Sequence, residues 1–293
     1  MGSGSWDVKS YVGYNTTRGI TSLDSGDRIG GQSAQQMFRQ RRLSAVLDPK
    51  NTMRECCDSE EHPNTVPVIL GLDVTGSMGS ASVRVAEKLN TIMTLLYNSV
   101  NDVEFMIMGI GDLFCDEAPL QASQFESDVR IAEQLDKIYF EGCGGSNGYE
   151  TYTSAWYYGL NHTKLDCWDR QKKALIITMG DEPINPYLPK SSLYKVLGDD
   201  VQCDVETKSL YDMATEKFEI HHITISDRST AYDRRGKLYA ESVDVSWKKY
   251  LDDEHYHIST LDELPNMISD IVKVHANSNT QNANSESFNE ISW

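Results

Sequence analysis

The chain has few basic side chains for its size, and this shortage narrows the classes of partner. Its 293 residues include 27 Lys and Arg against 44 Asp and Glu, so the formal net charge is −17. Proteins that bind nucleic acid need clustered basic residues to neutralise phosphates. One small basic cluster stands out, Arg39, Arg41 and Arg42, and we expect it to be a solvated helix face. The composition therefore predicts no nucleic-acid partner, and an anionic ligand would be repelled except where a cation reverses the local charge.

Long hydrophobic runs are also absent. No stretch of the sequence has the length and apolarity of a membrane-spanning helix. The opening residues, Met1 to Trp6, lack the basic and apolar regions of a signal peptide. Together these absences predict a cytoplasmic protein with no membrane partner.

Cysteine is sparse and irregularly spaced. The six cysteines are Cys56, Cys57, Cys115, Cys143, Cys167 and Cys203. Their spacing fits neither a zinc site nor a small disulfide framework, so we expect reduced thiols. A disulfide from Cys56 or Cys57 to Cys167 or Cys203 is left open.

The most informative stretch of the sequence runs from Val66 to Ser80. An apolar run of strand length ends in Asp73, and the hydroxyl residues Thr75 and Ser77 follow at alternate positions. Helical spacing then begins near Val83. A buried strand, a polar loop and a helix form the first half of a βαβ unit, and ligands of such sheets bind beyond the carboxyl ends of the strands.

One carboxylate and two hydroxyls are oxygen ligands of the kind that hard divalent cations prefer. Asp73, Thr75 and Ser77 are therefore candidate metal ligands. The alternative is a helix cap followed by a turn, because Asp, Ser and Thr all cap helices.

The segment from Asp73 to Met78, after an apolar strand, resembles the metal-ion-dependent adhesion site of von Willebrand factor type A (vWA) domains, the family that includes integrin I domains. The resemblance covers about Val66 to His275. It implies an α/β fold: a doubly wound, mostly parallel six-stranded sheet flanked by helices, of the bacterial or phage intracellular type. It also implies a bound cation, Mg²⁺ or else Mn²⁺ or Ca²⁺, which captures an Asp or Glu side chain of a partner protein.

Two later segments resemble the other loops of that site. The glycine-rich stretch from Gly142 to Thr151 places Glu150 at an acidic metal position, although Thr151 or Thr153 is an alternative ligand. The apolar strand that begins at Ala174 ends before Asp181, which would hold the ion directly or through water. Glu182 competes with Asp181 for that role.

Two enzymatic alternatives use the same loop. The stretch from Asp73 to Ser77 also resembles the phosphorylation loop of P-type ATPases and related phosphatases, with Asp73 as the nucleophile, but Val74 replaces the lysine. Thr75 to Gly79 differs by one residue from a Gly-x-Ser-x-Gly nucleophile elbow, with Ser77 as the nucleophile. The base would then be one of the histidines His221, His222, His255 and His257. We expect a non-catalytic protein, with a hydrolase or phosphatase as the alternative.

A third alternative is a structural subunit of a larger assembly. Soluble intracellular members of the vWA family often accompany AAA+ ATPases, so such a system is a possible partner. The sequence itself contains no ATPase segment.

The rest of the chain predicts three parts: residues 1–62 as a partly ordered N-terminal extension, 63–276 as the vWA domain, and 277–293 as a disordered tail. We expect a helix over 32–47, and a solvated acidic loop at Asp112, Asp116 and Glu117, with a second ion site there as the alternative. The adjacent pair His221 and His222 lies in a predicted strand, whose alternate faces argue against a metal site made of both.

Overall fold

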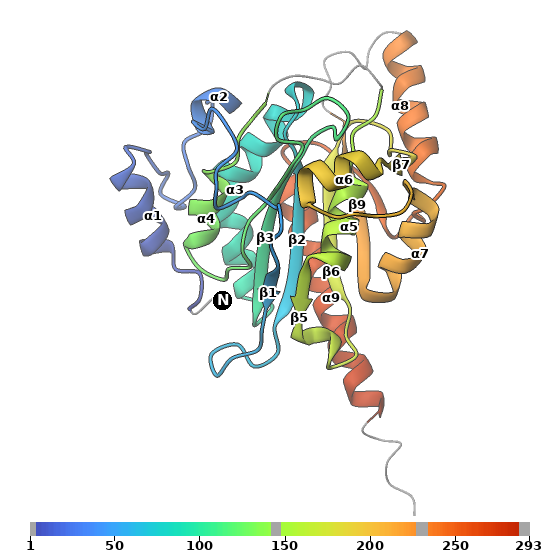
Figure 1. Cartoon of the computed structure of the whole chain (residues 1–293). Helices are drawn as coiled ribbons and strands as arrows, with labels where there is room; N and C mark the ends of the chain where they lie inside the picture. Colours follow the sequence, from blue (N-terminus) through green and yellow to red (C-terminus); the bar gives the residue numbers. More distant parts are fainter. Residues whose placement is uncertain (1–3, 142–147, 227–233, 287–293) are drawn as a thin grey trace, which may run out of the picture.

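The central feature of the fold is a six-stranded sheet in the order β10-β9-β6-β2-β3-β4 (Figure 1). The computed structural model describes the backbone of residues 4–141, 148–226 and 234–286. The sheet strands are β2 (Val66–Asp73), β3 (Val103–Ile110), β4 (Leu120–Ala122), β6 (Ala174–Gly180), β9 (Phe218–Ile225) and β10 (Tyr256–Ser259). All neighbouring strands are parallel except the edge strand β4, which is antiparallel to β3.

Helices cover both faces of this sheet. On one face α3 (Gly79–Tyr97), α4 (Arg130–Leu135) and α9 (Leu264–Glu286) pack against the sheet, and α1 (Val8–Thr17) and α2 (Ala34–Met37) pack against α3. The other face packs against α5 (Thr153–Asn161), α6 (Lys190–Leu197), α7 (Thr207–Lys217) and α8 (Arg234–Trp247). The predicted fold class, a doubly wound and mostly parallel α/β sheet flanked by helices, is confirmed.

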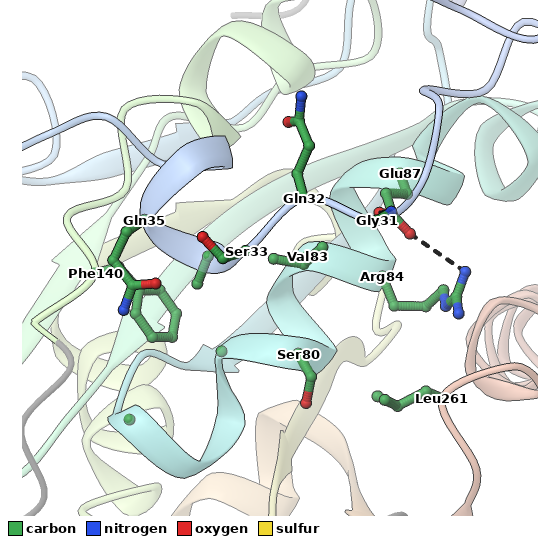
Figure 2. A pocket seen from close by; sticks show the side chains of 13 residues that line it. Gly31, Gln32, Ser33, Gln35, Ser80, Val83, Arg84, Glu87, Phe140 and Leu261 are labelled. Atoms are coloured by element: carbon green, nitrogen blue, oxygen red, sulfur yellow. Dashed lines mark hydrogen bonds and ion pairs between the residues drawn. The ribbon is translucent and has the colours of Figure 1, made fainter.

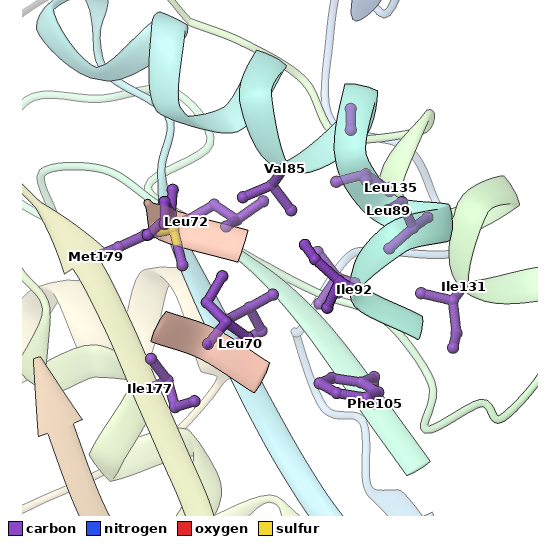
Figure 3. Packing of buried hydrophobic residues seen from close by; sticks show 14 of the residues in the cluster. Leu70, Leu72, Val85, Leu89, Ile92, Phe105, Ile131, Leu135, Ile177 and Met179 are labelled. Atoms are coloured by element: carbon purple, nitrogen blue, oxygen red, sulfur yellow. The ribbon is translucent and has the colours of Figure 1, made fainter. Parts of the chain in front are cut away.

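The core divides between the two faces because strand side chains alternate. Leu70 and Leu72 of β2 point into the cluster beneath α3, where they meet Val85 and Leu89 (Figure 3). Ile69, which directly precedes Leu70, belongs to the cluster on the α5 side. A strand buried on both faces reads as a continuous apolar run, and for this reason β2 was recognisable in the sequence.

The strand order places a topological switch point between β2 and β6. From β2 the chain builds β3 and β4 outward on one side, then returns to build β6, β9 and β10 on the other. The register pairs Leu72 with Met179, so the carboxyl ends of these two strands, at Asp73 and Gly180, lie side by side. Open α/β sheets bind ligands at such a point.

The N-terminal extension packs against the domain. Trp6 and Tyr11 are buried, and the Trp6 indole Nε1 donates to Asn90 Oδ1 of α3 at 3.0 Å. Arg28 forms a buried ion pair with Asp136 at 2.7 Å. These contacts explain the partial order predicted for residues 1–62, but the division of the chain into three parts stays a prediction.

Several local elements differ from the sequence expectation. The helix expected over 32–47 is confined to α2, and Phe38, its C-cap, has extended backbone. The antiparallel strand β4 was not predicted. Helix α9 continues to Glu286, past residue 276, where the sequence predicts a disordered tail, and residues 287–293 lie outside the described residues.

The remaining elements are short. They are the strands β1 (Arg54–Cys56), β5 (Thr163–Leu165), β7 (Tyr187–Leu188) and β8 (Val205–Glu206), and the 3₁₀ turns η1 (Gly76–Met78) and η2 (Asp166–Trp168). β1 pairs with β5 in parallel, and β7 pairs with β8 in antiparallel orientation.

The sequence predicts that the cysteines form no disulfides and that no helix spans a membrane, and the described residues bear on both. Reduced thiols are found at Cys56, Cys57, Cys167 and Cys203, while Cys143 lies outside the described residues. Within the described part of the chain, no helix is both long enough and apolar enough to cross a membrane.

Candidate metal site

Asp73 is held rigidly at the end of β2. It is 1% exposed, and its Oδ1 accepts hydrogen bonds from the Thr75 backbone N at 2.9 Å and from Thr75 Oγ1 at 2.6 Å. This local turn arises because a short acidic side chain bonds the backbone two residues on. The Asp73 and Thr75 side chains are thus fixed together beside the switch point.

Tyr152 holds the second oxygen of Asp73. Its hydroxyl donates to Asp73 Oδ2 at 2.7 Å, and the same hydroxyl accepts from the Glu182 backbone N at 3.3 Å. The Tyr152 ring is fully buried against Trp247 and His222. Tyr152 therefore links the loops after β2 and β6. Tyr152 was not predicted from the sequence, because no local pattern shows which aromatic side chain reaches a loop 79 positions away.

Gly180 makes room for that tyrosine. A Cβ atom at position 180 would lie 1.9 Å from the Tyr152 hydroxyl oxygen and 2.4 Å from its ring carbon Cζ. Only glycine, which lacks a Cβ, permits this approach. The last residue of β6 is thereby adapted to the contact between Tyr152 and Asp73.

Glu150 lies in the segment just before α5 and electrostatically interacts with Asp73. It is 4% exposed, forms an isolated parallel bridge with Ile184, and its Oε2 is buried without a hydrogen-bond partner among the described residues. Burial and the neighbouring carboxylates, Asp73 foremost and then Asp112, raise the pKa of Glu150 to about 10. A buried carboxylate that repels its neighbours and lacks a donor is costly unless a cation or a proton compensates it.

Asp181 completes the acidic surroundings. It follows β6 directly, is 3% exposed, and its charge contributes to the raised pKa of Asp73. Burial is the main cause of that shift; hydrogen bonds from Thr75 and Tyr152 oppose it, and the result is a pKa of about 7 for Asp73. The competing candidate, Glu182, is less buried and contacts Tyr152 through its backbone.

Four of the candidate ligands thus gather at one edge of the sheet: Asp73, Thr75, Glu150 and Asp181. The fifth, Ser77, has its backbone in the turn η1, but its side chain lies outside the described residues. Most of the glycine-rich loop, residues 142–147, also lies outside them.

The two alternative ligands in the second loop are engaged elsewhere. Thr151 Oγ1 donates to Gly111 O at 2.5 Å and accepts from Leu113 N at 3.1 Å. Thr153 Oγ1 accepts from Asn185 Nδ2 at 2.6 Å. Their hydroxyls hold loops together, which favours Glu150 as the ligand from this segment.

In the acidic loop after β3, Asp112 and Asp116 are buried and not solvated as predicted, and of the three acids only Glu117 is exposed. Asp112 is 0% exposed and accepts from Phe114 N at 2.9 Å, and Asp116 accepts from Asp112 N at 2.7 Å. Burial, followed by the charges of Glu141 and Asp112, raises the pKa of Asp116 to about 6. These carboxylates shape their own turn, while Glu117 is exposed.

A shallow pocket lies beside the loop after β2. It has a volume of ≈ 410 Å³ and is lined by Gly76, Gly79 and Ser80 on one side and by Gln32 and Ser33 on the other. Figure 2 shows Ser80 and Ser33 on opposite walls of this pocket. The pocket meets the loop of candidate ligands at Gly76, which follows Thr75, but none of Asp73, Thr75, Glu150 and Asp181 lines it.

The donor set fits a hard cation. Carboxylate and hydroxyl oxygens predominate, and the charged groups that act most strongly on Asp73 and Glu150 are other carboxylates. Mg²⁺, Mn²⁺ and Ca²⁺ all prefer such oxygens. Whether an ion binds here, and through which of these residues, stays a prediction.

No family model matches this sequence, and no curated protein matches it. Among solved structures, the pilus adhesin SpaC from Lactobacillus rhamnosus GG in its open conformation is similar over 78% of this chain and 31% of that chain, with 13% identity and a TM-score of 0.47. Proximal thread matrix protein 1 from the mussel byssus is similar over 72% of this chain and 46% of that chain, with 11% identity and a TM-score of 0.42.

The vWF domain of the type V pili tip protein Mfa5 from Porphyromonas gingivalis is similar over 72% of this chain and 94% of that chain, with 12% identity and a TM-score of 0.41. This chain spans less than half the length of the SpaC and thread matrix chains. At such identities and TM-scores, these similarities establish neither family membership nor function.

Proposed function

We propose that this chain is a non-catalytic protein-binding module in which a divalent cation captures a carboxylate of a partner protein. Mg²⁺ is the first candidate ion, with Mn²⁺ and Ca²⁺ as alternatives. Asp73, Thr75, Ser77, Glu150 and Asp181 would hold it. This is the metal-ion-dependent adhesion site that the sequence resemblance implies.

The observation that carries the proposal is the buried Glu150 carboxylate. Its Oε2 lacks a hydrogen-bond donor among the described residues, and the Coulomb interactions acting on it come mainly from Asp73, Asp112 and Asp116. Proteins rarely bury several carboxylates together without a compensating charge. A cation between Glu150, Asp73 and Asp181 supplies that charge.

When bound, the ion supplies positive charge for a partner's carboxylate in a poorly hydrated site. The protein's own residues determine how accessible the ion is to the partner's carboxylate. Tyr152 and Thr75 hold Asp73 in one orientation, and the pocket lined by Gly76 and Ser80 adjoins the site. The overall acidity of the chain then makes the ion necessary for an acidic ligand to approach.

The contacts of the histidines favour a binding module over a hydrolase. A nucleophilic hydroxyl at Ser77 would need a base, but His221 contacts Glu219 and His257, and His222 contacts Thr178. Asp73 itself accepts from Thr75 and Tyr152. These contacts make the hydrolase or phosphatase the second candidate function, after the binding module.

The cellular setting stays a prediction. A cytoplasmic location and a role as a subunit of a larger assembly follow from the sequence reading alone. An AAA+ ATPase system as partner has no support among the similar structures, two of which are named as pilus proteins.

The test is a peptide-display selection on the immobilised protein in millimolar MgCl₂, with elution by EDTA. We expect the EDTA eluate to be enriched in peptides that contain Asp or Glu, and we expect no enrichment on the Asp73→Ala variant. Glu117→Gln is the matched control, because Glu117 is an exposed acid on a neighbouring loop and should leave the selection unchanged. Acidic peptides retained equally in EDTA would rule the proposal out.

A further inference from the structure

A second group of metal-ligating side chains lies on the sheet away from the acidic site. Glu219 and His221 are two residues apart in β9 and therefore share a face of the strand. The backbone N of His222 donates to His255 O at 3.0 Å, which sets His255, the residue just before the neighbouring strand β10, beside His221. These residues lie near the start of β9 and β10, whereas Asp73 lies at the end of its strand.

The side chains of this group converge. One potential ligand atom from each of Glu219, His221 and His255 lies within 4.8 Å of the others. His221 Nε2 is 3.0 Å from Glu219 Oε1, and His221 Nδ1 is 3.0 Å from His257 Nε2. Two imidazoles and a carboxylate with a third imidazole adjoining form a donor set typical of zinc sites.

Each outer member of the group is supported by a further residue. Asp252 Oδ1 lies 2.6 Å from Nδ1 of His255, so a proton on that nitrogen leaves Nε2 with its lone pair. His275 of α9 contacts Glu219 Oε2 at 2.5 Å through Nδ1. Ligating histidines and carboxylates usually have such partners, which orient them toward the ion.

We propose that Glu219, His221 and His255 form a binding site for a transition-metal ion of the Zn²⁺ class, which leaves a fourth position for water. Imidazole ligands favour Zn²⁺, Cu²⁺ and Ni²⁺ over Mg²⁺, so this site differs in chemistry from the oxygen-rich one at Asp73. Tetrahedral zinc ligands lie roughly 3.3 Å apart, given metal–ligand distances of about 2.0–2.1 Å. His221 Nε2 and Glu219 Oε1 lie 3.0 Å apart, close to that spacing, and all three ligand atoms lie within 4.8 Å of one another.

Accessibility also suits a site that takes up an ion. The His255 side chain is 32% exposed, whereas that of His221 is 7% exposed. The ion can therefore enter from the His255 side. A bound ion would link β9, which carries Glu219 and His221, to His255 just before the edge strand β10. Glu219 also contacts His275 of α9, so the ion would lie close to that helix.

The competing explanation is a proton-sharing network without metal. Although burial raises it, the pKa of Glu219 is held below its ordinary value by hydrogen bonds from His221 and His275, as in an ion pair. A protonated His221 that donates to Glu219 and to His257 would satisfy the same contacts. Metal binding and proton sharing make opposite predictions for added Zn²⁺.

The experiment is a Zn²⁺ titration of untagged, metal-stripped protein, followed by calorimetry and by the absorption spectrum of the Co²⁺ form. We expect one Zn²⁺ per chain at this site, a tetrahedral Co²⁺ spectrum and a higher Tm. His255→Ala should weaken Zn²⁺ binding more than about 100-fold, and Asp252→Asn about 10-fold. Glu254 is an exposed neighbour of His255, so the control variant Glu254→Gln should leave the Zn²⁺ affinity unchanged.

Two further variants test the Zn²⁺ site independently of the stability of His255→Ala and of the site at Asp73. Glu219→Gln removes a ligand in a nearly isosteric way, and it must weaken Zn²⁺ binding even if His255→Ala proves unstable. Asp73→Asn must leave Zn²⁺ binding intact, because it alters the other site. The proposal is overturned if wild-type protein binds no Zn²⁺ here, or if Asp73→Asn abolishes binding while His255→Ala and Glu219→Gln retain it.

Discussion

Replacing Asp73 with asparagine abolishes the rise in Tm that Mg²⁺ gives the wild-type protein. At 100 times the dissociation constant, a ligand that binds the folded state alone adds about 2.7 kcal/mol of stability. For a domain of this size, that corresponds to a rise in Tm of roughly 5–10 °C. Asp73→Asn removes one anionic ligand from the site and preserves its shape, so the rise should vanish.

The same variant should be no less stable than wild type when metal is absent. Asp73 is buried, and the charge of Asp181 disfavours its ionised form. The amide oxygen of asparagine can still accept from Thr75, and the Tyr152 hydroxyl can accept from the amide NH₂ in place of donating. Loss of one negative charge then relieves repulsion, so the Tm in EDTA should be equal or higher. The control is Asp253→Asn, whose carboxylate is 96% exposed. A Mg²⁺-dependent rise that persists in Asp73→Asn would show that the ion binds elsewhere.

Replacing Gly180 with alanine destabilises the fold and disrupts the candidate site together. The new Cβ would lie 1.9 Å from the Tyr152 hydroxyl, and the ring cannot retreat because it packs on Trp247 and His222. Overpacking of this kind costs about 2–3 kcal/mol, or roughly 5–10 °C in Tm. Thermal unfolding followed by circular dichroism measures the loss.

Gly13→Ala is the matched control for that substitution. Gly13 is exposed in α1, and a Cβ there meets no atom within 4 Å. Alanine should be neutral or stabilising by up to about 1 kcal/mol in a helix. If Gly180→Ala had an equally small effect, the close approach of Tyr152 to β6 would be wrong.

The sequence predicted the central strands because they are buried on both faces. Val66–Asp73 and Ala174–Gly180 are continuous apolar runs with a carboxylate at the end of the run or just after it, a local pattern that identifies both the element and its end. The short antiparallel strand β4 has no such run. Its pairing with β3 depends on a chain reversal through the buried turn at Asp112 and Asp116, and tertiary contacts determine that turn.

The candidate site was only partly predictable for the same reason. Asp73 and Asp181 could be found at strand ends, but Tyr152 acts across 79 positions and shows no periodic signal. The cluster at Glu219 was likewise missed, since His221 was considered as a metal ligand only together with its neighbour His222. That pair does face opposite ways: His222 stacks on Trp247, while His221 meets His257 across the strand pair. Strand register, which a single sequence does not reveal, decides which histidines meet.

The most direct test of the central claim is a diffraction measurement on crystals grown with MnCl₂, with data collected at the manganese absorption edge. We expect one strong anomalous peak between Asp73, Glu150 and Asp181, at about 2.0–2.2 Å from its protein oxygen ligands or one water molecule farther. A map without such a peak at saturating Mn²⁺, with the buried carboxylates unchanged, would contradict the account.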